Sequence, residues 1–467
     1  MGFLGTTFNV MGGVARGATA ASLWTGNMIY TGIQNARTKK EIRELYQHAT
    51  DSNFQNRSVA VLPNVSKQQL MLTTSEPEDN DVYDYDVSDR NAALNYIWGE
   101  NDDPEGVIVS GGQNIERVNA LIPFIHKVQT KKIPLFVIHS ENSALEKMTY
   151  AHSDDCECIS AYGAYYDVFR GMPVDDIAFL LYETMQLNGE TTPAAESLLR
   201  ALIEVVLRNE GSVTINNLAT YPLMSLKSDI DNMYAKGFFN SDEYSEITQF
   251  YMAGTSETAA VRIFLSKLNR QAENVYGKGN SKRSNIKRML NKNGAICIDV
   301  GVSGNELLVA LVTKHIDMLQ SQGKHLAVLL DGLPLSRYSN LSDLLRGKIY
   351  ALSNNDLVSS LYGGSSRGDD LFSEITGNVA TVVLFRHSSG STCQKWSDYL
   401  GKYKKIKIRY NISQNNAYMN SSDSRGLSVD ETEEPRVRAE TLSKLPAATA
   451  CIYCNDGILI AEVNEPV

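Results

Sequence analysis

The chain has 467 residues, of which 43% are hydrophobic and 21% are charged, and its net charge is −10. These proportions are ordinary for a soluble globular protein, and the length predicts two or three domains, or one large α/β domain with an insertion. The acidic balance argues against a surface coated with basic residues for nonspecific DNA binding, although a local basic stripe is compatible with it.

Residues 1–56 are predicted to be an N-terminal helical segment. No run reaches the ~18 uninterrupted apolar residues of a transmembrane helix. The nearest run, 17–33, contains polar residues and three glycines. We interpret it as a helix that packs on protein or lies at a membrane surface, with a spanning helix as the less favoured alternative. We therefore expect a cytoplasmic protein that is at most peripherally attached at the inner face of the cell membrane.

The six cysteines do not form a disulfide framework for a chain of this size, and a reducing interior is the simpler assumption. His152, Cys156 and Cys158 could supply three zinc ligands, but zinc sites favour wider C-x2-C spacing with a second pair. We therefore predict no metal site. Cys451 and Cys454 lie in a strand-like run, where we expect them to be buried as small apolar residues.

An α/β core is predicted to begin at residue 57. Its first strand candidates are short apolar runs, at 58–62, 69–74, 106–110 and 134–139. The acidic stretch 75–89 lacks apolar periodicity and is predicted to be a solvated loop. A helical pattern at 114–128 stands between the last two strands. Such a β-α-β unit with continuous apolar strands indicates a parallel sheet covered on both faces.

An all-α insertion is predicted at 173–285, where apolar residues recur three and four positions apart. The β pattern then resumes, with strand candidates at 294–301, 325–331, 379–385 and 404–410 and a hairpin around 455–457. The polar stretch 420–435 is predicted to be a mobile loop. The fold class is therefore α/β, with a mainly parallel core formed by 57–172 and 286–467.

The strand before residue 111 is followed by Gly111 and Gly112, and a helix begins near Asn114. A nucleotide-binding P-loop protein places its phosphate cradle at such a junction, because glycines allow a tight turn and the helix N-terminus attracts an anion. A P-loop requires G-x-x-x-x-G-K-[ST], however, and Glu116 and Arg117 stand where the lysine and the hydroxyl are needed. A carboxylate there would repel a γ-phosphate. A strand–helix turn that required glycine is the simpler interpretation.

Asp331 ends the apolar run HLAVLLD, where a Walker B aspartate would hold Mg²⁺. The next residue is Gly332, so the carboxylate that orients the attacking water is missing. An aspartate before a Gly-x-Pro turn also has a structural explanation, since it caps turns well. Taken alone, Asp331 does not establish a catalytic site.

The order of these parts resembles the coupling proteins of type IV secretion and conjugation (TraG/TraD-type), which are hexameric RecA-like ATPases that deliver DNA or protein to a secretion channel. The family's strand–P-loop–helix segment ends in a proline and is similar to VSGGQNIERVNALIPFI, with Pro123 at that place. Its second strand resembles PLFVIHSENSALEKM, an all-α domain follows, and its Walker B strand and turn resemble HLAVLLDGLPLSRYSNLSDLLRG. Its Tyr-Gly block and closing segment resemble NNDLVSSLYGGSSRGDDLFSEITGNVATVVLFR and RVRAETLSKLPAATACIY. The resemblance covers roughly residues 57–465.

The resemblance implies a RecA-like P-loop NTPase core, homo-oligomerisation, ATP with Mg²⁺ as cofactor, and substrate recognition by the all-α domain. Aligned on Pro123, Glu116 falls at the phosphate lysine and Arg117 at the Mg²⁺ hydroxyl. The implied cofactor-binding positions are those of the degenerate P-loop and of an arginine finger, namely Gly111, Gly112, Gln113, Asn114, Glu116, Arg117 and Arg367. Each replaced group is one that hydrolysis requires, so the sequence leaves open whether the chain is an ATPase.

A basic stripe lies in the strand candidate 404–410 and just before it. Tyr403 and Tyr410 are interleaved with its basic residues, which are Lys402, Lys404, Lys405, Lys407 and Arg409. Such a stripe could track phosphates and stack bases of a nucleic acid. The same alternation is typical of an edge strand that discourages strand addition.

Three functions are consistent with the sequence. The first is a coupling-protein-like component of conjugative DNA transfer or type IV secretion with a degenerate nucleotide site, whose partners would be secretion or relaxosome proteins, DNA, or an active paralogue. The second is an active but unorthodox DNA-translocating ATPase. The third is a RecA-like scaffold with no nucleotide role.

Overall fold

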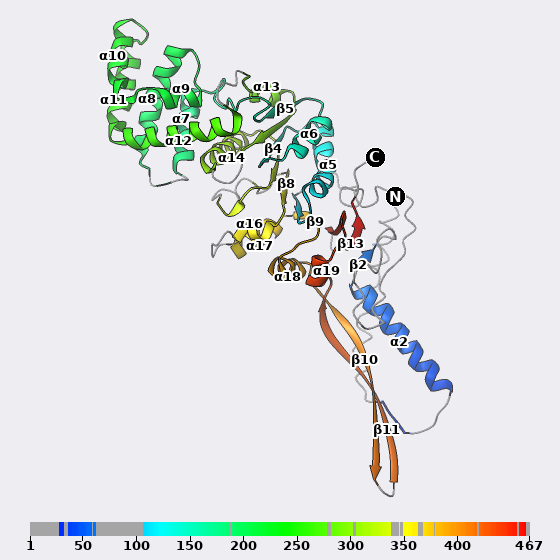
Figure 1. The fold of residues 1–467 in the computed structure, drawn as a ribbon. Coiled ribbons are helices and arrows are strands. Elements are labelled where there is room, and N and C mark those ends of the chain that lie inside the picture. Colours follow the sequence, from blue (N-terminus) through cyan, green and yellow to red (C-terminus); the bar gives the residue numbers. More distant parts are fainter. Residues whose placement is uncertain are drawn as a thin grey trace. The chain divides into compact units, whose positions relative to one another are not determined.

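The protein is described here from a computed structural model. It describes residues 28–31, 36–57, 59–61, 106–186, 189, 191–277, 282–301, 305–337, 345, 349–362, 368–377, 379–417, 420–454 and 457–463. The chain forms two compact units (Figure 1). One consists of Met1–Gly99 with Thr381–Val467, and the other of Glu100–Ala380.

Among the described residues of the unit Glu100–Ala380, six strands pair with one another in parallel. In spatial order they are β3 (Gly106–Ser110), β8 (Ile349–Asn354), β7 (Ala327–Asp331), β4 (Leu135–His139), β6 (Ala295–Asp299) and β5 (Cys156–Ile159). Every residue of β3, β4 and β7 is buried, so neither face of these apolar strands is open to solvent. The predicted mainly parallel sheet is confirmed.

Helix α5 (Asn114–Thr130) follows β3 and packs against α6 (Ser143–Ala151). The helix predicted at 114–128 is confirmed, and it continues for about two turns beyond Pro123. A proline inside a helix costs about 3 kcal/mol. The residues after it include three that are fully buried, Phe124, Ile125 and Val128. Burying each contributes about 1.5–3 kcal/mol, which outweighs the proline.

Helices α7 to α12 follow β5 and pack mainly on one another (Figure 1). They are α7 (Val174–Gln186), α8 (Pro193–Glu210), α9 (Ile215–Thr220), α10 (Leu226–Ala235), α11 (Ser241–Gly254) and α12 (Thr258–Tyr276), with 3-10 turns at Leu223–Ser225 and Thr255–Glu257. Helix α8 is central, since it contacts α7, α11 and α12. Gly254 permits close packing there, because a Cβ at this position would lie 2.6 Å from Leu198 Cβ.

The remaining elements of this unit complete the covering of the sheet. They are α13 (Ile286–Asn291), α14 (Glu306–Ser321), α16 (Leu357–Tyr362), α17 (Gly368–Gly377) and a 3-10 turn at Leu335–Arg337. Helix α14 connects sheet and helices, since its His315 ring lies edge-on to Phe136 of β4 and the helix also packs on α7 and α12.

The other unit contains neighbouring strands in the order β2 (Val59–Val61), β13 (Gly457–Glu462), β12 (Thr449–Cys454) and β9 (Val379–Leu384). The predicted hairpin is confirmed, because Cys454 pairs with Gly457 in antiparallel register. Cys451 and Cys454 are buried, as expected. Helices α18 (Gly390–Tyr399) and α19 (Ala439–Ser443) pack on each other.

A long two-stranded ribbon belongs to the same unit (Figure 1). It consists of β10 (Lys402–Ala417) and β11 (Asn420–Pro435), with β1 (Met28–Thr31) added to β11 and α2 (Ala36–Arg57) lying against β10. The mobile loop predicted at 420–435 is therefore wrong, because the polar stretch forms a strand whose backbone pairs along its full length with β10. Polar residues on both faces of a two-stranded ribbon give no apolar alternation to detect.

The N-terminal segment also differs from the prediction. Residues 28–31 form a strand where a helix was expected, and 36–57 are helical as expected. The rest of 17–33, the strand candidate 69–74 and the acidic stretch 75–89 lie outside the described residues. Within the described ranges, no helix has the length and apolar character needed to cross a membrane.

Candidate functional site at the carboxyl edge of the parallel sheet

Five neighbouring strands of the parallel sheet end in polar residues at one edge. In spatial order these are Ser110 of β3, Asn354 of β8, Asp331 of β7, His139 of β4 and Asp299 of β6. The register is level, since His139 is the partner of both Asp331 and Asp299. Ligands of open α/β sheets bind outside this edge, so it is the candidate site.

The turn from β3 into α5 is short. Only Gly111, Gly112 and Gln113 separate Ser110 from the first helical residue, and both glycines have positive φ, 87° and 67°. A P-loop needs more residues than this to wrap backbone N–H groups around a phosphate. Two of the N–H groups already have partners: Gly111 N donates to Asn354 O at 3.0 Å and Gln113 N to the Glu116 carboxylate at 2.5 Å.

Arg117 folds back over this turn. Its Nη1 donates to Gly112 O at 3.1 Å and lies 3.5 Å from Gly111 O, while Nη2 donates to Asn114 Oδ1 at 3.4 Å. The side chain is 8% exposed. Burial lowers the pKa of the guanidinium, and the charges of Asp331 and Glu116 oppose that shift. The turn therefore presents carbonyl oxygens to a buried cation of its own chain.

Asp331 is buried, and its carboxylate accepts two side-chain hydrogen bonds. Its carboxylate accepts from Ser353 Oγ at 2.5 Å and from Asn142 Nδ2 at 2.7 Å. The side-chain amides of Asn142 and Asn114 also bond to each other, at 2.7 and 2.8 Å. One polar network therefore connects the Walker B-position Asp331 to Arg117 through two asparagines.

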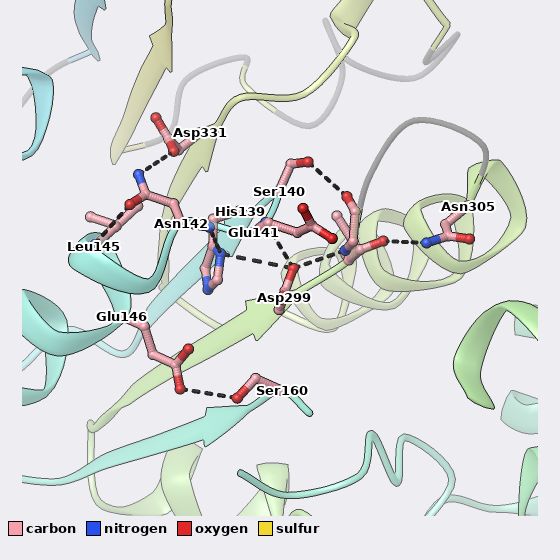
Figure 2. Close-up of polar contacts among 12 residues, drawn as sticks. His139, Ser140, Glu141, Asn142, Leu145, Glu146, Ser160, Asp299, Asn305 and Asp331 are labelled. Carbon is pink, nitrogen blue, oxygen red and sulfur yellow. Dashed lines mark hydrogen bonds and ion pairs between the residues drawn. The ribbon is translucent and has the colours of Figure 1, made fainter. Parts of the chain in front are cut away.

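Beside this network lies a second group of contacts, around Asp299 (Figure 2). Asp299 Oδ1 accepts from Glu141 N at 3.0 Å and from Gly301 N at 2.8 Å. It lies 4.0 Å from Nδ1 of His139, which in turn accepts from Asn142 N at 3.1 Å. These bonds hold the ends of β4 and β6 in fixed positions.

His139 is buried in its neutral form. Burial lowers the pKa of the imidazole, and the carboxylates of Asp299, Glu146 and Asp331 oppose that shift. Because Nδ1 accepts a hydrogen bond, we assign the proton to Nε2, which is buried and has no hydrogen-bond partner among the described residues. Glu146, one helix turn beyond Asn142, accepts instead from Ser160 Oγ at 3.0 Å.

The structure brings most of the predicted site residues together. Gly111, Gly112, Gln113, Asn114, Glu116, Arg117 and Asp331 all lie at this edge. Arg367 lies outside the described residues. Gly332 has φ 70°, so it forms the turn after β7. The sequence reasoning missed His139, Asn142, Asp299 and Ser353. The rule that selected Asp331, a polar residue ending an apolar strand, would have found His139 and Asp299 as well.

The predicted basic stripe is divided between the two faces of β10. Lys402 and Lys404 are exposed, whereas Lys405 is buried and lies 3.6 Å from Glu434 of β11. Lys407 is 2.9 Å from the same carboxylate. For Arg409 the structure describes only the backbone, which pairs with Ser428.

The register also places acidic residues opposite the lysines. Lys404 is the register partner of Glu433, and Lys407 is the register partner of Asp430. Glu431 lies between these two acidic residues in β11, and Glu434 follows Glu433. Burial alone would raise the pKa of Glu434, but its hydrogen bonds to Lys407 and Arg438 lower it below its ordinary value. The ribbon base is therefore closer to charge balance than the sequence of β10 alone indicates. Among the described strands, β10 lies at the edge of its sheet.

No group of three or more histidine, cysteine, aspartate and glutamate side chains within the described ranges is arranged to hold a metal ion. At the sheet edge, Asp331 is the carboxylate at the Mg²⁺ position, and its oxygens accept from Ser353 and Asn142. A Mg²⁺ ion prefers oxygen ligands and would have to displace these donors.

Comparison with known proteins agrees with this description. A family profile described as "Type IV secretion-system coupling protein DNA-binding domain" matches residues 349–466. No curated protein matches the chain. Among solved structures, the unbound bacterial conjugative coupling protein TrwBdeltaN70 has a TM-score of 0.50 at 15% identity, covering 78% of this chain and 86% of that chain.

Two further structures are similar over shorter or less well superposed regions. The plasmid coupling protein TrwB in complex with the ATP analogue ADPNP gives a TM-score of 0.48 at 15% identity, over 78% of this chain and 86% of that chain. VirB4 of Thermoanaerobacter pseudethanolicus gives 0.37 at 11% identity, over 65% and 83%. The P-loop NTPase-type fold of TrwBdeltaN70 and the predicted resemblance to type IV secretion coupling proteins are confirmed.

Proposed function

We propose that this chain is a coupling-protein-like component of conjugative DNA transfer or type IV secretion that recruits or handles a DNA or protein substrate without hydrolysing ATP. The observation that carries the coupling role is the profile match over 349–466, a domain described in that family as DNA-binding. The fold similarity to a conjugative coupling protein supports it.

The absence of hydrolysis is proposed from the geometry of the β3–α5 turn. A P-loop cradle works because its N–H groups and lysine face the phosphates. Here Gly111 N and Gln113 N donate elsewhere, and the carbonyls of Gly111 and Gly112 face Arg117. Glu116 adds a negative charge in the first helical turn. A triphosphate would have to break these contacts and approach a carboxylate.

The partners follow from the same proposal. The helices of 173–285 would recruit the substrate, and secretion or relaxosome proteins, DNA, or an active paralogue with ATP and Mg²⁺ would complete the apparatus. The chain would act as a homo-oligomer or beside that paralogue, in the cytoplasm or at the inner face of the membrane. The stretch 57–172 with 286–467 would form the RecA-like body, and 1–56 a separate N-terminal segment.

The coupling role is tested by transfer frequency from donor cells that lack the chain and are complemented with variants. Met224 and Met252 are 84% and 63% exposed on the helical part, so Met224→Glu and Met252→Glu should fold normally. We expect the native chain to restore transfer and at least one of these variants to restore it poorly. Tyr150→Glu, at a side chain 66% exposed on α6, is the matched control and should restore it fully.

Two results would count against the proposal. If donors without the chain transfer normally, the coupling role is wrong. If the purified native chain hydrolyses ATP, the proposed lack of hydrolysis is wrong, but the proposed coupling role is not contradicted.

A further inference from the structure

The segment 258–292 concentrates positive charge in an acidic chain. It contains nine lysines and arginines and one acidic residue, Glu273, whereas the whole chain has a net charge of −10. It consists of helix α12, the return to the sheet and helix α13, and its Lys278 lies outside the described residues. Such an asymmetry within one chain indicates a surface for a polyanion if the cations are exposed together.

Helix α12 carries three of these cations on its solvent-facing side. Arg262, Lys267 and Arg270 are exposed, and within the described ranges none of them takes part in an ion pair. At 3.6 residues per turn they fall within an arc of about 140° and extend over about 12 Å of the helix. The opposite side is buried, including Val261 and Leu268. The three charges therefore point to solvent from one side of the helix.

The cations of the return segment lie next to the end of α12. The ring of Tyr276, the last residue of the helix, packs edge-on against Tyr165, with centroids 5.4 Å apart. Tyr165 N donates to Lys282 O at 2.8 Å, and Ser284 N donates to Tyr165 O at 3.0 Å. Lys282 therefore follows the end of α12 in space as well as in sequence. The exposed cations of this part are Lys282, Lys287 and Arg288.

Two other cations of the segment have structural roles. Lys292 pairs with Asp155 at 2.6 Å, and the Arg283 guanidinium stacks 4.4 Å from the centroid of the Tyr165 ring. The carboxylate of Glu273 accepts from Asn269 on α12 itself, at 3.1 Å. The other six described cations of the segment are exposed.

We propose that these six exposed cations form a basic surface that binds the phosphate backbone of a nucleic acid. The surface consists of Arg262, Lys267, Arg270, Lys282, Lys287 and Arg288. A nucleic acid presents a regular row of negative charges, and its affinity for a protein comes largely from lysine and arginine at the phosphates. The surface lies outside 349–466, the part that matches the profile described as DNA-binding, so it is a separate contact.

The composition of the surface favours a nucleic acid over a protein or a membrane. Protein interfaces are depleted in lysine and centre on apolar or aromatic anchors, whereas Ile263, 56% exposed, is the one large apolar side chain that α12 exposes. A helix that lies in a membrane inserts its apolar side, and that side of α12 packs on α8, α9 and α14. Nucleic-acid interfaces are polar and strongly positive, as this surface is.

Fluorescence anisotropy tests the surface, with a labelled strand of about 30 nucleotides, single or in a duplex, titrated with the full chain. Six phosphate contacts predict that log K falls with log salt with a slope of about −4 on the single strand and about −5 on the duplex. The tighter of the two probes identifies the form that is bound. The triple variant Arg262→Gln, Lys267→Gln, Arg270→Gln should roughly halve the slope and weaken binding by about tenfold or more at about 0.1 M salt.

A matched control removes the same charge from exposed positions outside the segment. The triple variant Lys147→Gln, Lys236→Gln, Lys324→Gln should keep its Kd within about twofold of the native value, because charges beyond about 10 Å are screened at this salt concentration. Circular dichroism of both triple variants checks that the fold is retained.

Three results would overturn the proposal. The first is a native chain that binds neither probe with a Kd below about 100 μM, the weak end of nonspecific binding. The second is equal weakening by both triple variants. The third is a labelled polyglutamate of the same charge that binds as tightly as the nucleic acid, since it would assign the surface to an acidic protein.

This inference deepens the proposed recruiting role of the helices and rests on that role for its meaning in the cell, but the binding assay does not depend on transfer. If the chain binds nucleic acid through this surface and donors without the chain transfer normally, the proposed function is wrong and the surface stands. If transfer requires the chain and the chain binds no nucleic acid, only the surface is wrong.

Discussion

Replacing Arg117 with methionine tests whether this side chain is a structural part of the β3–α5 turn. Met fills a similar volume but removes the donors to Gly112 O and Asn114 Oδ1. It also removes the positive charge near the buried Asp331. An unsatisfied buried carbonyl costs about 1–3 kcal/mol, and the loss of the neighbouring charge adds to it, while removal of a buried cation offsets part of both. We expect a net loss of about 2–3 kcal/mol, or roughly 3–5 °C in the Tm of a unit of this size.

The assay is calorimetric unfolding of the Arg117→Met variant beside Arg262→Met. Arg262 is exposed on α12, so the same chemical change there should alter stability by less than about 0.5 kcal/mol. A double-mutant cycle with Asn114→Ala should give a coupling of about 0.5–3 kcal/mol, because the two side chains are bonded.

If Arg117→Met is as stable as Arg262→Met, Arg117 is not a structural part of the turn. That result would mean that the guanidinium is held loosely and is available to a ligand. The turn would then be an empty anion site.

Three further predictions follow from buried groups. Gly254→Ala should lower the free energy of unfolding by about 1–3 kcal/mol, because the new Cβ would lie 2.6 Å from Leu198 Cβ and 2.7 Å from Ala194 O. Gly390→Ala is the control and should be neutral, because a Cβ there has no neighbour within 4 Å. Urea unfolding of both variants measures the difference. Burial lowers the pKa of His315 to about 3. Between about pH 6.5 and pH 3 the imidazole is therefore protonated in the unfolded chain and neutral in the folded one. The free energy of unfolding should fall by about 2 kcal/mol from pH 6.5 to pH 5. His315→Gln should reduce this slope in unfolding curves at the two pH values, and an unchanged slope would assign it to other groups. Glu434→Gln should destabilise the ribbon base by about 1–3 kcal/mol, because Lys405 is 8% exposed and loses an ionic partner; equal Tm values for variant and native chain would contradict this.

The sequence predicted the parallel sheet well because its strands are continuous apolar runs, such as GVIVS and PLFVIH, which have few alternatives. It failed at 420–435, where register with β10 rather than local composition decides the conformation. It succeeded at the helix predicted over 114–128, because the apolar pattern continues past Pro123 into Phe124 and Ile125, which are buried.

The candidate site was predictable in position but not in detail. The glycines after β3 and the aspartate ending β7 are local signals. The role of Arg117 is different, because its position in the chain does not show that its side chain turns back onto the carbonyls of Gly111 and Gly112. Asn142 was missed for the same reason: it connects Asp331 to Asn114 across more than a hundred residues of sequence. Such contacts depend on which strands are neighbours in the sheet.

We propose that the turn between β3 and α5 does not bind a nucleotide. Isothermal calorimetry of ATP with Mg²⁺ into the purified native chain tests it most directly, with Glu116→Lys titrated beside it to measure how far the carboxylate alone opposes binding. We expect no saturable heat for the native chain. Saturable binding of ATP–Mg²⁺ by the native chain, lost in Arg117→Met, would contradict it and identify Arg117 as a phosphate ligand.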